Sequence, residues 1–347
     1  MKPIVARLNA VTFPVLEAER EILSTINAQI IELEGATDDE ILAVAANADA
    51  VMICSAYLHG AVIGKMNKLK VISRMGTGVD KIDVAEATRR GIVVTNLPDF
   101  STEEVADHTL AMILATARRL KFYDTNMRQG RKPCSVAGIH RLSTQTLGII
   151  GFGRIGKAVA KRARAFGMKV MIHDPFIKSN EAAQWEVQAV DFDTLLVNAD
   201  YLSLLCPLTD DNRKMIAMEQ LRRMKPTAAL INTGRGELIN ENNLVEALKT
   251  GVIRAAALDV FEGINVFNEN GFDTNHPFFG IDNILLTPHV SANSEEALAS
   301  ARLDGARNIV AVLSGGTPTN VVSVRHCGLD PQFPKTNFNK KNKQIIN

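Results

Sequence analysis

Two side chains of this sequence stand where they could do chemistry. Arg235 lies in the run INTGRGELI and His289 in the run LLTPH, and each follows apolar residues typical of a buried strand. A guanidinium there offers a fixed fork of N–H donors that matches a carboxylate, and an imidazole titrates near neutral pH, as a general acid or base must. Taken singly, an arginine is more often a surface residue and a lone histidine is more often structural.

Two glycine-rich segments could hold anions. In LGIIGFGRIG, an apolar run leads into Gly151, Gly153 and Gly156 and then into an alanine-rich helical pattern. The first glycine permits a sharp turn, the second a close approach of backbone to a pyrophosphate, and the third close packing of helix on strand. A glycine turn in an unrelated α/β domain is the alternative. The run SRMGTGVD, residues 73–80, could form an anion nest or a glycine turn without a ligand.

An acidic residue follows the next predicted strand. The strand Lys169–Ile172 leads to Asp174, whose carboxylate could accept hydrogen bonds from ribose hydroxyls. The same carboxylate would repel a 2′-phosphate, so the sequence predicts NAD rather than NADP as the cofactor.

The elements that would position these residues alternate between strand and helix, which predicts an α/β fold with parallel sheets. Ligands bind at the carboxyl edge of such sheets. The strands predicted in the first part of the chain are Ile4–Arg7, Gln29–Leu33, Ala50–Ile53, Val71–Arg74 and Val93–Thr95. Those predicted in the second part, which favour a doubly wound Rossmann-type sheet, are Leu147–Ile150, Lys169–Ile172, Tyr201–Leu204, Ala228–Ile231, Ala255–Leu258 and Ile284–Leu286.

Two long helical patterns connect the parts. Thr102–Leu120 is predicted as one helix with Ser101 as its N-cap and Glu104 in a capping box, and Ser294–Leu313 as a helix that returns the chain to the first part. The predicted domains are therefore a discontinuous substrate-binding domain over residues 1–100 and 291–324 and an NAD-binding domain over residues 101–290. Residues 325–347 have no helical or strand period and are predicted to be a poorly ordered tail.

Composition argues against several classes of function. The length of 347 residues is enough for about two domains, and a net charge of +1 gives no general attraction to nucleic acid or membrane. No apolar run reaches the ~18 residues that span a bilayer, and the N-terminus has no signal-peptide core. The four cysteines are scattered without zinc-ligand spacing, which favours reduced thiols in a cytoplasmic protein and no metal site.

Together these segments resemble the D-isomer specific 2-hydroxyacid dehydrogenase family over residues 2–324. The matching motifs are MGTGVDKID, NLPDFSTEEVAD, GFGRIG, INTGRGELI, ALDVFEG and LLTPH. The resemblance implies two Rossmann-like lobes with the active-site cleft between them: a discontinuous flavodoxin-like lobe for the substrate and a doubly wound lobe for NAD. It also implies a homodimer, and hydride transfer between a D-2-hydroxy acid and a 2-keto acid. Long stretches also resemble the C-terminal binding proteins, a corepressor branch of the family.

The family's site residues carry over by motif. Arg235 would bind the substrate carboxylate and keto oxygen, His289 would act as general acid and base, and Thr77 and Gly78 would donate backbone N–H groups to the carboxylate. Asp259 would hydrogen-bond the nicotinamide carboxamide. The implied cofactor-binding residues are Gly151, Gly153, Arg154, Ile155, Gly156, Asp174, Cys206, Pro207, Thr233, Gly234 and Asp259.

One departure from the family concerns the partner of the catalytic histidine. The glutamate that pairs with this histidine is replaced by Ile264, and the proline that follows it by Asn265. Because such a glutamate stabilises an imidazolium, three interpretations stay open. Glu262 takes its place, since residues two apart in an extended segment face the same side; Glu269 or Asp273 reaches in from the next loop; or the site is weakened.

A second departure concerns the substrate. Ala292 stands where the corepressor branch has a tryptophan, and the run CSAYL, residues 54–58, offers Tyr57 but no arginine. A phosphorylated substrate would need fixed cations there, which, with no added regulatory domain in the sequence, disfavours 3-phosphoglycerate. The sequence therefore predicts an NAD-dependent dehydrogenase of a small D-2-hydroxy acid. A cofactor-sensing binding protein with vestigial activity and an enzyme that oxidises formate or phosphite are the competing hypotheses.

Overall fold

The computed structural model describes residues 2–132, 138–264, 266 and 271–322, so the predicted tail lies outside the described residues. The chain divides into two compact units. Unit 1 contains the residues up to Pro98 together with those from Ser300 onward, and unit 2 runs from Asp99 to Ala299. The second division falls at residue 300, inside a helix, rather than at residue 291 in the turn before that helix.

Unit 1 is built on a five-stranded parallel sheet in the order β2-β1-β3-β4-β5. This is the predicted flavodoxin-like order, which reverses direction between β1 and β3. Its strands are β1 (Ile4–Arg7), β2 (Gln29–Glu32), β3 (Ala50–Ile53), β4 (Val71–Arg74) and β5 (Val93–Thr95). Its helices are α1 (Glu17–Ser24), α2 (Asp38–Ala45), α3 (Gly60–Lys65), α4 (Val84–Arg89) and the larger part of α12 (Glu295–Leu313).

Both faces of this sheet are buried, which explains why its central strand, β3, is apolar throughout. Val5 and Met52 pack in one core with Ile309 of α12. Their neighbours along the strands, Ala6 and Val51, pack in the core on the other face. Successive side chains of a strand point to opposite faces. Because each face is covered by a core, side chains on both faces are buried.

Unit 2 is built on a seven-stranded parallel sheet in the order β12-β11-β10-β9-β6-β7-β8. The order reverses between β6 and β9, as in a doubly wound dinucleotide-binding sheet with one added strand. Its strands are β6 (Thr146–Ile150), β7 (Lys169–His173), β8 (Gln188–Ala189), β9 (Tyr201–Leu204), β10 (Ala229–Asn232), β11 (Ala255–Leu258) and β12 (Ile284–Leu286). Its α-helices before α12 are α5 (Thr102–Ala117), α6 (Leu120–Arg128), α7 (Arg154–Ala165), α8 (Ser179–Gln184), α9 (Phe192–Asn198), α10 (Met218–Arg223) and α11 (Glu241–Lys249). Short 3-10 helices lie at η1 (Leu142–Thr144), η2 (Asp210–Asn212), η3 (Gly236–Leu238) and η4 (Pro277–Gly280).

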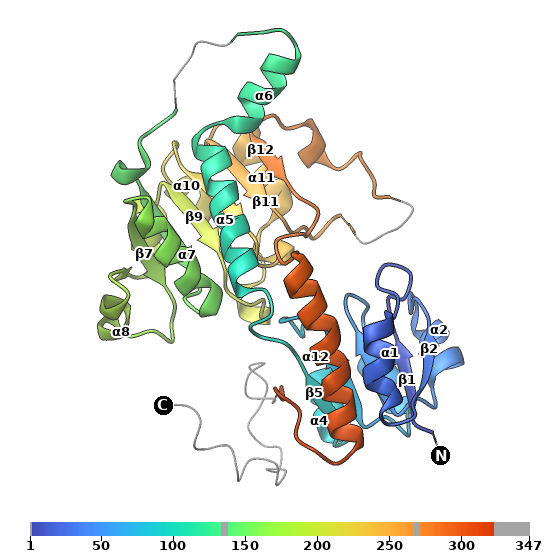
Figure 1. Cartoon of the computed structure of the whole chain (residues 1–347). Coiled ribbons are helices and arrows are strands. Elements are labelled where there is room, and N and C mark those ends of the chain that lie inside the picture. The colour runs from blue at the N-terminus through green and yellow to red at the C-terminus, as the bar shows by residue number, and fades with distance from the viewer. Residues whose placement is uncertain (1, 133–137, 265, 267–270, 323–347) are drawn as a thin grey trace. The chain divides into compact units, whose positions relative to one another are not determined.

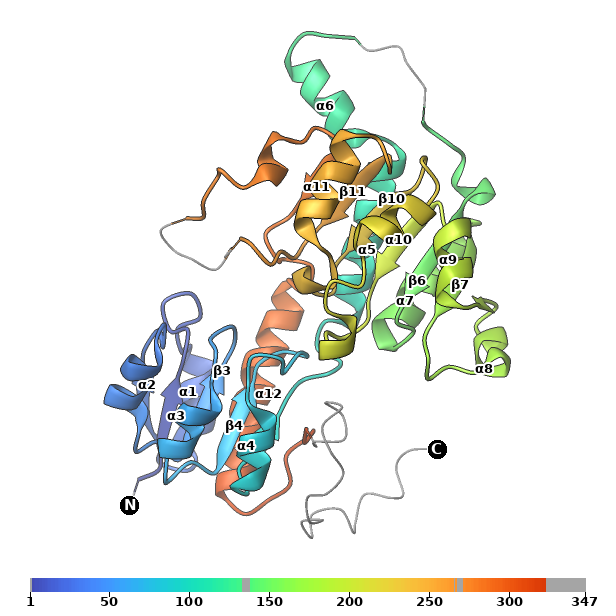
Figure 2. The same ribbon diagram turned by 180° about the vertical axis from the view of Figure 1, so that it is seen from behind.

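Helices cover both faces of the unit 2 sheet. α5 and α7 lie over one face (Figure 1), and α9, α10 and α11 lie over the other (Figure 2). Leu110 of α5 and Val159 of α7 pack with Ile149 of β6 in one core, whereas Leu244 of α11 packs with Leu202 of β9 in the other. None of the helices in the described part of the chain is long and apolar enough to cross a membrane.

The helix predicted over Thr102–Leu120 is in fact two helices. α5 ends at Ala117, Arg119 adopts a left-handed conformation with φ +53°, and α6 begins at Leu120. α5 has buried side chains along its length up to Ala117, whereas no side chain of α6 is buried. Tertiary burial supplies most of the stability of a helix in a protein, and that support stops where α5 ends.

The predicted capping box is wrong. Ser101 is the N-cap residue of α5, but its side chain makes no capping hydrogen bond. The carboxylate of Glu104 instead accepts a hydrogen bond from the hydroxyl of Ser294 at 2.8 Å, so a long-range contact replaces the local one. The sequence pattern also misses β8, because a strand of two residues carries no periodic signal.

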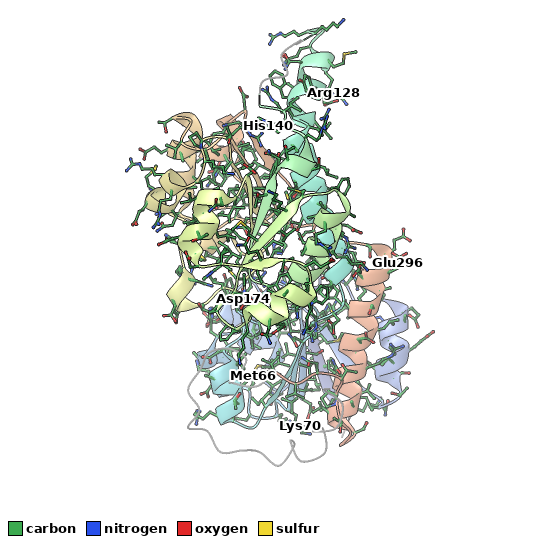
Figure 3. The ribbon with its side chains drawn as sticks, turned by 90° about the vertical axis from the view of Figure 1, so that its left-hand side faces the viewer. Met66, Lys70, Arg128, His140, Asp174 and Glu296 are labelled. Carbon is green, nitrogen blue, oxygen red and sulfur yellow. The ribbon has the colours of Figure 1, made fainter. Side chains whose placement is uncertain are left out.

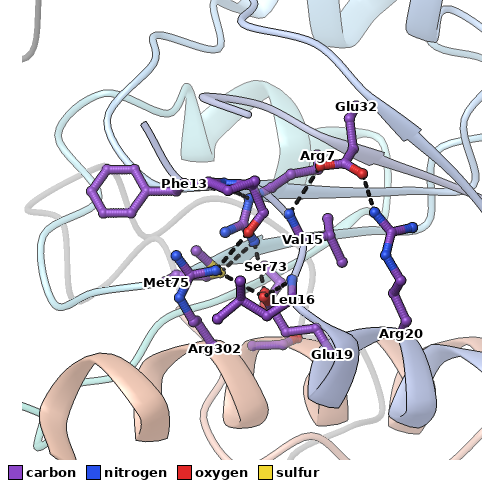
Figure 4. A network of polar contacts seen from close by, with 12 residues as sticks. Arg7, Phe13, Val15, Leu16, Glu19, Arg20, Glu32, Ser73, Met75 and Arg302 are labelled. Atoms are coloured by element: carbon purple, nitrogen blue, oxygen red, sulfur yellow. Dashed lines mark hydrogen bonds and ion pairs between the residues drawn. The ribbon is translucent and has the colours of Figure 1, made fainter. Parts of the chain in front are cut away.

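A buried ion-pair network links α12 to the sheet of unit 1 (Figure 4). Glu19 accepts from Nη1 of Arg7 at 3.0 Å on one oxygen and from Nη1 of Arg302 at 2.9 Å on the other. Nε of Arg7 also donates to the carbonyl oxygen of Phe13 at 2.8 Å. Burial lowers the pKa of Arg7, and the charge of Glu19 opposes that shift. Glu19 thus compensates two guanidinium groups that the protein interior would otherwise disfavour.

The substitution Glu19→Gln should lower the free energy of unfolding by about 3–5 kcal/mol, because both guanidinium groups would stay in place without their counter-charge. Urea denaturation followed by circular dichroism measures the change. The matched control is the double variant Arg7→Met/Glu19→Leu, which removes the buried pair together and should lose less stability. A Glu19→Gln protein as stable as the parent would show that this carboxylate carries no such role.

Candidate active site

The glycine turn after β6 has the geometry that its motif predicts. Gly151 has φ +94°, and a Cβ atom there would lie 2.6 Å from the backbone nitrogen of Cys206. A Cβ atom on Gly156 would lie 2.3 Å from the carbonyl oxygen of Gly151. Both positions therefore accept only glycine, because any side chain would collide with backbone.

The remaining glycine of the motif borders open space. A Cβ atom on Gly153 would have no atom of the described residues within 4 Å, and Gly153 precedes α7 without a side-chain cap. Gly153 and the start of α7 lie at the reversal of strand order, where dinucleotides bind and where the first N–H groups of a helix can hold a phosphate. The residues present there fit the pyrophosphate of NAD.

Arg154 and Ile155 begin α7. Nε of Arg154 lies 2.5 Å from Oδ1 of Asp99 in an exposed ion pair, and Ile155 packs against the core of unit 2. The backbone N–H groups of these two positions are available to a phosphate at the start of the helix.

Asp174 ties the end of β7 to the glycine turn (Figure 3). Its Oδ2 accepts a hydrogen bond from the N–H of Phe152 at 2.7 Å, and its Oδ1 accepts one from the N–H of Phe176 at 2.9 Å. A carboxylate oxygen has two lone pairs, so each oxygen can accept a further bond from a ribose hydroxyl. The predicted position of Asp174 beside the turn is therefore what the structure shows.

Cys206 and Pro207 form the loop after β9, opposite the glycine turn. The contact between the backbone of Cys206 and Gly151 puts this loop at the same crevice of the sheet. Burial, together with the nearby charge of Asp174, raises the pKa of the Cys206 thiol to about 11. The thiol is therefore protonated at neutral pH.

Arg235 lies in a turn that Asn232 holds at the carboxyl end of β10. Nδ2 of the buried Asn232 donates to the carbonyl oxygen of Arg235 at 2.8 Å, and its Oδ1 accepts from the N–H of Gly234 at 3.0 Å. Oγ1 of Thr233 lies 2.8 Å from Oγ1 of Thr109 on α5. Sequence reasoning missed the role of Asn232, although an asparagine at the start of a turn is itself a signal, since its side chain bonds to nearby backbone.

The arginine turn, residues 232–236, packs directly on the segment after β11. A Cβ atom on Gly236 would lie 2.2 Å from the carbonyl carbon of Phe261. The half-buried Arg235 donates from Nη1 to the carbonyl oxygen of Gly234 at 2.9 Å. Close packing of backbone therefore fixes the turn that carries the side chain of Arg235.

His289 lies in a strained turn, the histidine turn of residues 287–291, which Asp259 holds. The φ of His289 is +55°, a conformation that costs a residue with a side chain about 1–3 kcal/mol. Asp259 is fully buried, and its carboxylate accepts hydrogen bonds from the N–H of Val290 at 3.0 Å, the N–H of Ser291 at 2.9 Å and the hydroxyl of Thr287 at 2.6 Å. These bonds compensate the strain and fix the backbone that carries the imidazole.

Asp259 therefore has a positioning role that the sequence did not indicate. Its carbonyl oxygen also accepts a hydrogen bond from the N–H of His289 at 2.9 Å. The predicted bond between Asp259 and the nicotinamide carboxamide stays a prediction.

Glu262 does not take the place of the missing glutamate. Its carboxylate lies 3.5 Å from Nζ of Lys214, and its N–H donates to Glu241 at 2.8 Å. Glu262 is exposed, whereas Ile264 is buried in the core of unit 2. The expectation that these two residues share a side requires an extended segment, and the chain bends at residues 262 and 263 instead.

The other acids proposed as partners of the histidine are placed differently. Oδ1 of Asp273 accepts a hydrogen bond from the N–H of Asn275 at 2.8 Å, so this carboxylate stabilises its own turn. Glu269 and Asn265 lie outside the described residues.

The loop after β4, in unit 1, contains the predicted substrate contacts Thr77 and Gly78. The hydroxyl of Thr77 donates to the carbonyl oxygen of Leu97 at 3.1 Å, and Nδ2 of Asn96 donates to the carbonyl oxygen of Thr77 at 2.6 Å. These bonds fix the loop through the hydroxyl and carbonyl of Thr77 and do not use its N–H group.

A cation that sequence reasoning missed lies beside the segment of residues 54–58. Nζ of Lys81 donates to the carbonyl oxygen of Ser55 at 2.8 Å and lies 4.8 Å from the centroid of the Tyr57 ring. Tyr57 is half exposed and stacks on His59. The segment itself has no arginine, but the loop that follows β4 brings a lysine to it.

Cys206 should react slowly with iodoacetamide at neutral pH and faster as the pH rises toward 11, because only the thiolate is nucleophilic. Mass spectrometry of the alkylated peptides measures the rate, and the Cys206→Ser variant identifies the peptide. NAD should slow the reaction further by covering the loop. Rapid alkylation of Cys206 at neutral pH in the folded protein would be inconsistent with its burial.

Comparison with known proteins places these features in a family. Residues 110–291 match the model described as D-isomer specific 2-hydroxyacid dehydrogenase, NAD binding domain. D-3-phosphoglycerate dehydrogenase of Methanocaldococcus jannaschii is 40% identical over 332 residues, which cover 95% of this chain and 61% of that protein. Glyoxylate reductase of Thermococcus litoralis is 41% identical over 263 residues, which cover 74% of this chain and 77% of that protein.

A solved structure is similar over nearly the whole chain. D-lactate dehydrogenase of Aquifex aeolicus, solved with NAD and lactic acid, has a TM-score of 0.80 and 28% identity, and the match covers 92% of this chain and 98% of that one. The matched family model contains the glycine turn, the arginine turn and the histidine turn. From the family model and these identities, the chain belongs to the D-isomer specific 2-hydroxyacid dehydrogenase family.

Proposed function

We propose that this protein is an NAD-dependent dehydrogenase that interconverts a D-2-hydroxy acid and a 2-keto acid. The observation that carries the proposal is the arrangement at one edge of the unit 2 sheet. Arg235 follows β10 and His289 follows β12, which are the two neighbours of β11, and the glycine turn follows β6. Because all the strands are parallel, the three features lie at the carboxyl edge, where ligands bind in such sheets.

The roles of the side chains follow from their chemistry. The guanidinium of Arg235 binds the substrate carboxylate through paired N–H donors. Thr77 and Gly78 stay predicted donors to the substrate from the family resemblance. In the direction of reduction, bound NADH supplies a hydride to the 2-carbon. The imidazolium of His289 gives a proton to the keto oxygen, which becomes the hydroxyl group, and in oxidation the neutral imidazole takes that proton back.

The proposed cofactor is NAD rather than NADP. Asp174 stands beside the glycine turn, held by the N–H groups of Phe152 and Phe176. Its oxygens can accept bonds from ribose hydroxyls, whereas its charge opposes a 2′-phosphate. The open space beside the Cα atom of Gly153 supports the proposal that a pyrophosphate binds at the start of α7.

The proposed substrate is a small 2-keto acid without a phosphate group. The segment of residues 54–58 contains no arginine, whereas a phosphate group would need fixed cations there. The likeness to a glyoxylate reductase supports this choice. The chain spans only 61% of the length of the phosphoglycerate dehydrogenase described above, so that likeness does not carry the substrate over.

The relatives described above are all named as enzymes, which gives no support to the cofactor-sensing alternative or to the oxidation of formate or phosphite. A cytoplasmic location stays a prediction from the cysteine pattern.

We also propose a homodimer that covers α6. Figures 1 and 2 both show this helix extending from the end of α5 beyond the sheet of unit 2. None of its side chains is buried, and Leu120 is 54% and Met127 75% exposed. Isolated helices shorter than about 12–15 residues are marginal in water, so a helix of 9 residues with an uncovered apolar face is best explained by a second copy that packs against it.

The substitution His289→Ala should lower kcat for reduction of glyoxylate or hydroxypyruvate by about 10²–10⁴-fold, because no positioned acid remains to protonate the keto oxygen. Arg235→Ala should raise KM for the keto acid as well as lower kcat, since the carboxylate loses its guanidinium. Oxidation of NADH, followed by its absorbance, measures both. Reduction by the parent should slow as the pH rises and the oxidation of the hydroxy acid should speed up, because the two directions use opposite forms of the imidazole.

The control for these variants is cofactor binding. Trp185 is the single tryptophan of the chain, and its ring centroid lies 6.2 Å from that of Phe152 in the glycine turn, so its fluorescence should report NADH binding without turnover. Both variants should bind NADH like the parent. An Arg235→Ala enzyme that turns over as fast as the parent would refute the assigned role, and NADH binding without turnover of any keto acid would favour a cofactor-sensing protein.

The substitution Met127→Glu should convert the dimer to a monomer. The new carboxylate would be buried in the interface, against the apolar side of α6 of the second copy. Sedimentation velocity measures the mass. The matched control is Val44→Glu, which introduces the same charge at an exposed apolar residue of α2. It should leave the mass unchanged. A monomeric parent, or a Met127→Glu protein that is still dimeric, would exclude this interface.

A further inference from the structure

Helix α5 contacts both catalytic turns through consecutive residues. Oγ1 of Thr109 lies 2.8 Å from Oγ1 of Thr233 in the arginine turn. His108, the residue before it, places Nε2 3.0 Å from Oγ1 of Thr287 in the histidine turn and 3.7 Å from Oδ1 of Asp259. Since α5 packs on β10 and β11, it is a common support for the two turns.

The donors and acceptors around Thr287 fix the direction of each hydrogen bond. The carboxylate of Asp259 can only accept, and a threonine hydroxyl has a single proton to donate. The short contact of 2.6 Å between Thr287 and Asp259 uses that proton. The hydroxyl oxygen must therefore accept from His108, whose Nε2 carries the proton in both its neutral and its charged form here.

We propose that His108 is a positioning residue for the reaction, because its Nε2–H directs the hydroxyl of Thr287 onto Asp259 and so holds the turn that presents His289. The proposal rests on the proposed role of His289 as general acid and base. Asp259 is fully buried, and the side chain of His108 is 22% exposed. His108 lies on the side of the hydrogen-bond network that faces α5. Loss of the His108 donor would let the Thr287 hydroxyl rotate and would loosen the carboxylate that fixes the turn.

The expected signature separates positioning from binding. A displaced imidazole slows proton transfer, while the substrate carboxylate still meets Arg235 and the cofactor still meets the glycine turn. His108→Phe, which fills the volume of the ring without a donor, should therefore lower kcat about tenfold. KM for the keto acid and the affinity for NADH should change less than about twofold, because neither binding site loses a group.

Three further variants make the test specific. His108→Gln keeps an N–H donor on a side chain of similar reach and should restore most of kcat. Thr287→Val removes the hydroxyl through which His108 acts, so the double variant His108→Phe/Thr287→Val should be no slower than Thr287→Val alone. Thr109→Val, the matched change at the next residue of α5, loosens the arginine turn and should raise KM for the keto acid instead.

The outcomes distinguish this inference from the proposed function. If His289→Ala is inactive while His108→Phe keeps the kcat of the parent, the positioning role is refuted and the proposed function stands. Losses that multiply in the double variant, or an equally slow His108→Gln, would also refute it, because His108 would then not act through a donor to Thr287. If His289→Ala remains active, the proposed function itself fails. Thermal unfolding and NADH binding by Trp185 fluorescence confirm that each variant is folded.

Discussion

The candidate site depends on one buried carboxylate. Asp259 has no exposed surface, and a charge in that position would be unfavourable unless hydrogen-bond donors surround it. The donors come from the histidine turn, which supplies two backbone N–H groups and a hydroxyl. By taking these bonds the carboxylate holds His289 in a left-handed conformation that few residues with a side chain adopt. The buried charge and the strained turn are therefore each stable only in the presence of the other.

The other half of the site depends on close approach between backbone segments. Glycine at position 151 allows contact with the loop that contains Cys206, and glycine at position 236 allows contact with the segment after β11. Such contacts leave loops little freedom, so the carboxyl edge of the sheet is preorganised where a cofactor and a carboxylate would bind. Helix α5 adds a lateral connection, because His108 and Thr109 reach the two catalytic turns from one rigid element.

The sequence predictions succeeded where the interactions join neighbouring residues, and the predicted side-chain contacts failed where the partners are distant in sequence. Buried parallel strands are apolar runs, so the longer strands are recognised within a residue or two of their observed ends. The glycine motif after β6 was recognised because a position without room for a Cβ atom requires glycine, and this requirement is visible in the local sequence. The failed predictions of side-chain contacts concern partners distant in sequence: Glu104 bonds to Ser294, and Glu262 pairs with Lys214.

By itself, the sequence determined which residues form the longer strands, where the glycine turn after β6 needs glycine, and that Arg235 and His289 follow strands of one parallel sheet. These properties depend on local sterics and on the burial of apolar runs, which are expressed in adjacent residues. Only the tertiary structure decided that Asp259 anchors the histidine turn, that Asn232 shapes the arginine turn, and that α5 touches both. A buried polar group must find its partner wherever the fold brings one, and residues 259 and 291, or 108 and 287, meet only after the sheet and its helices have assembled.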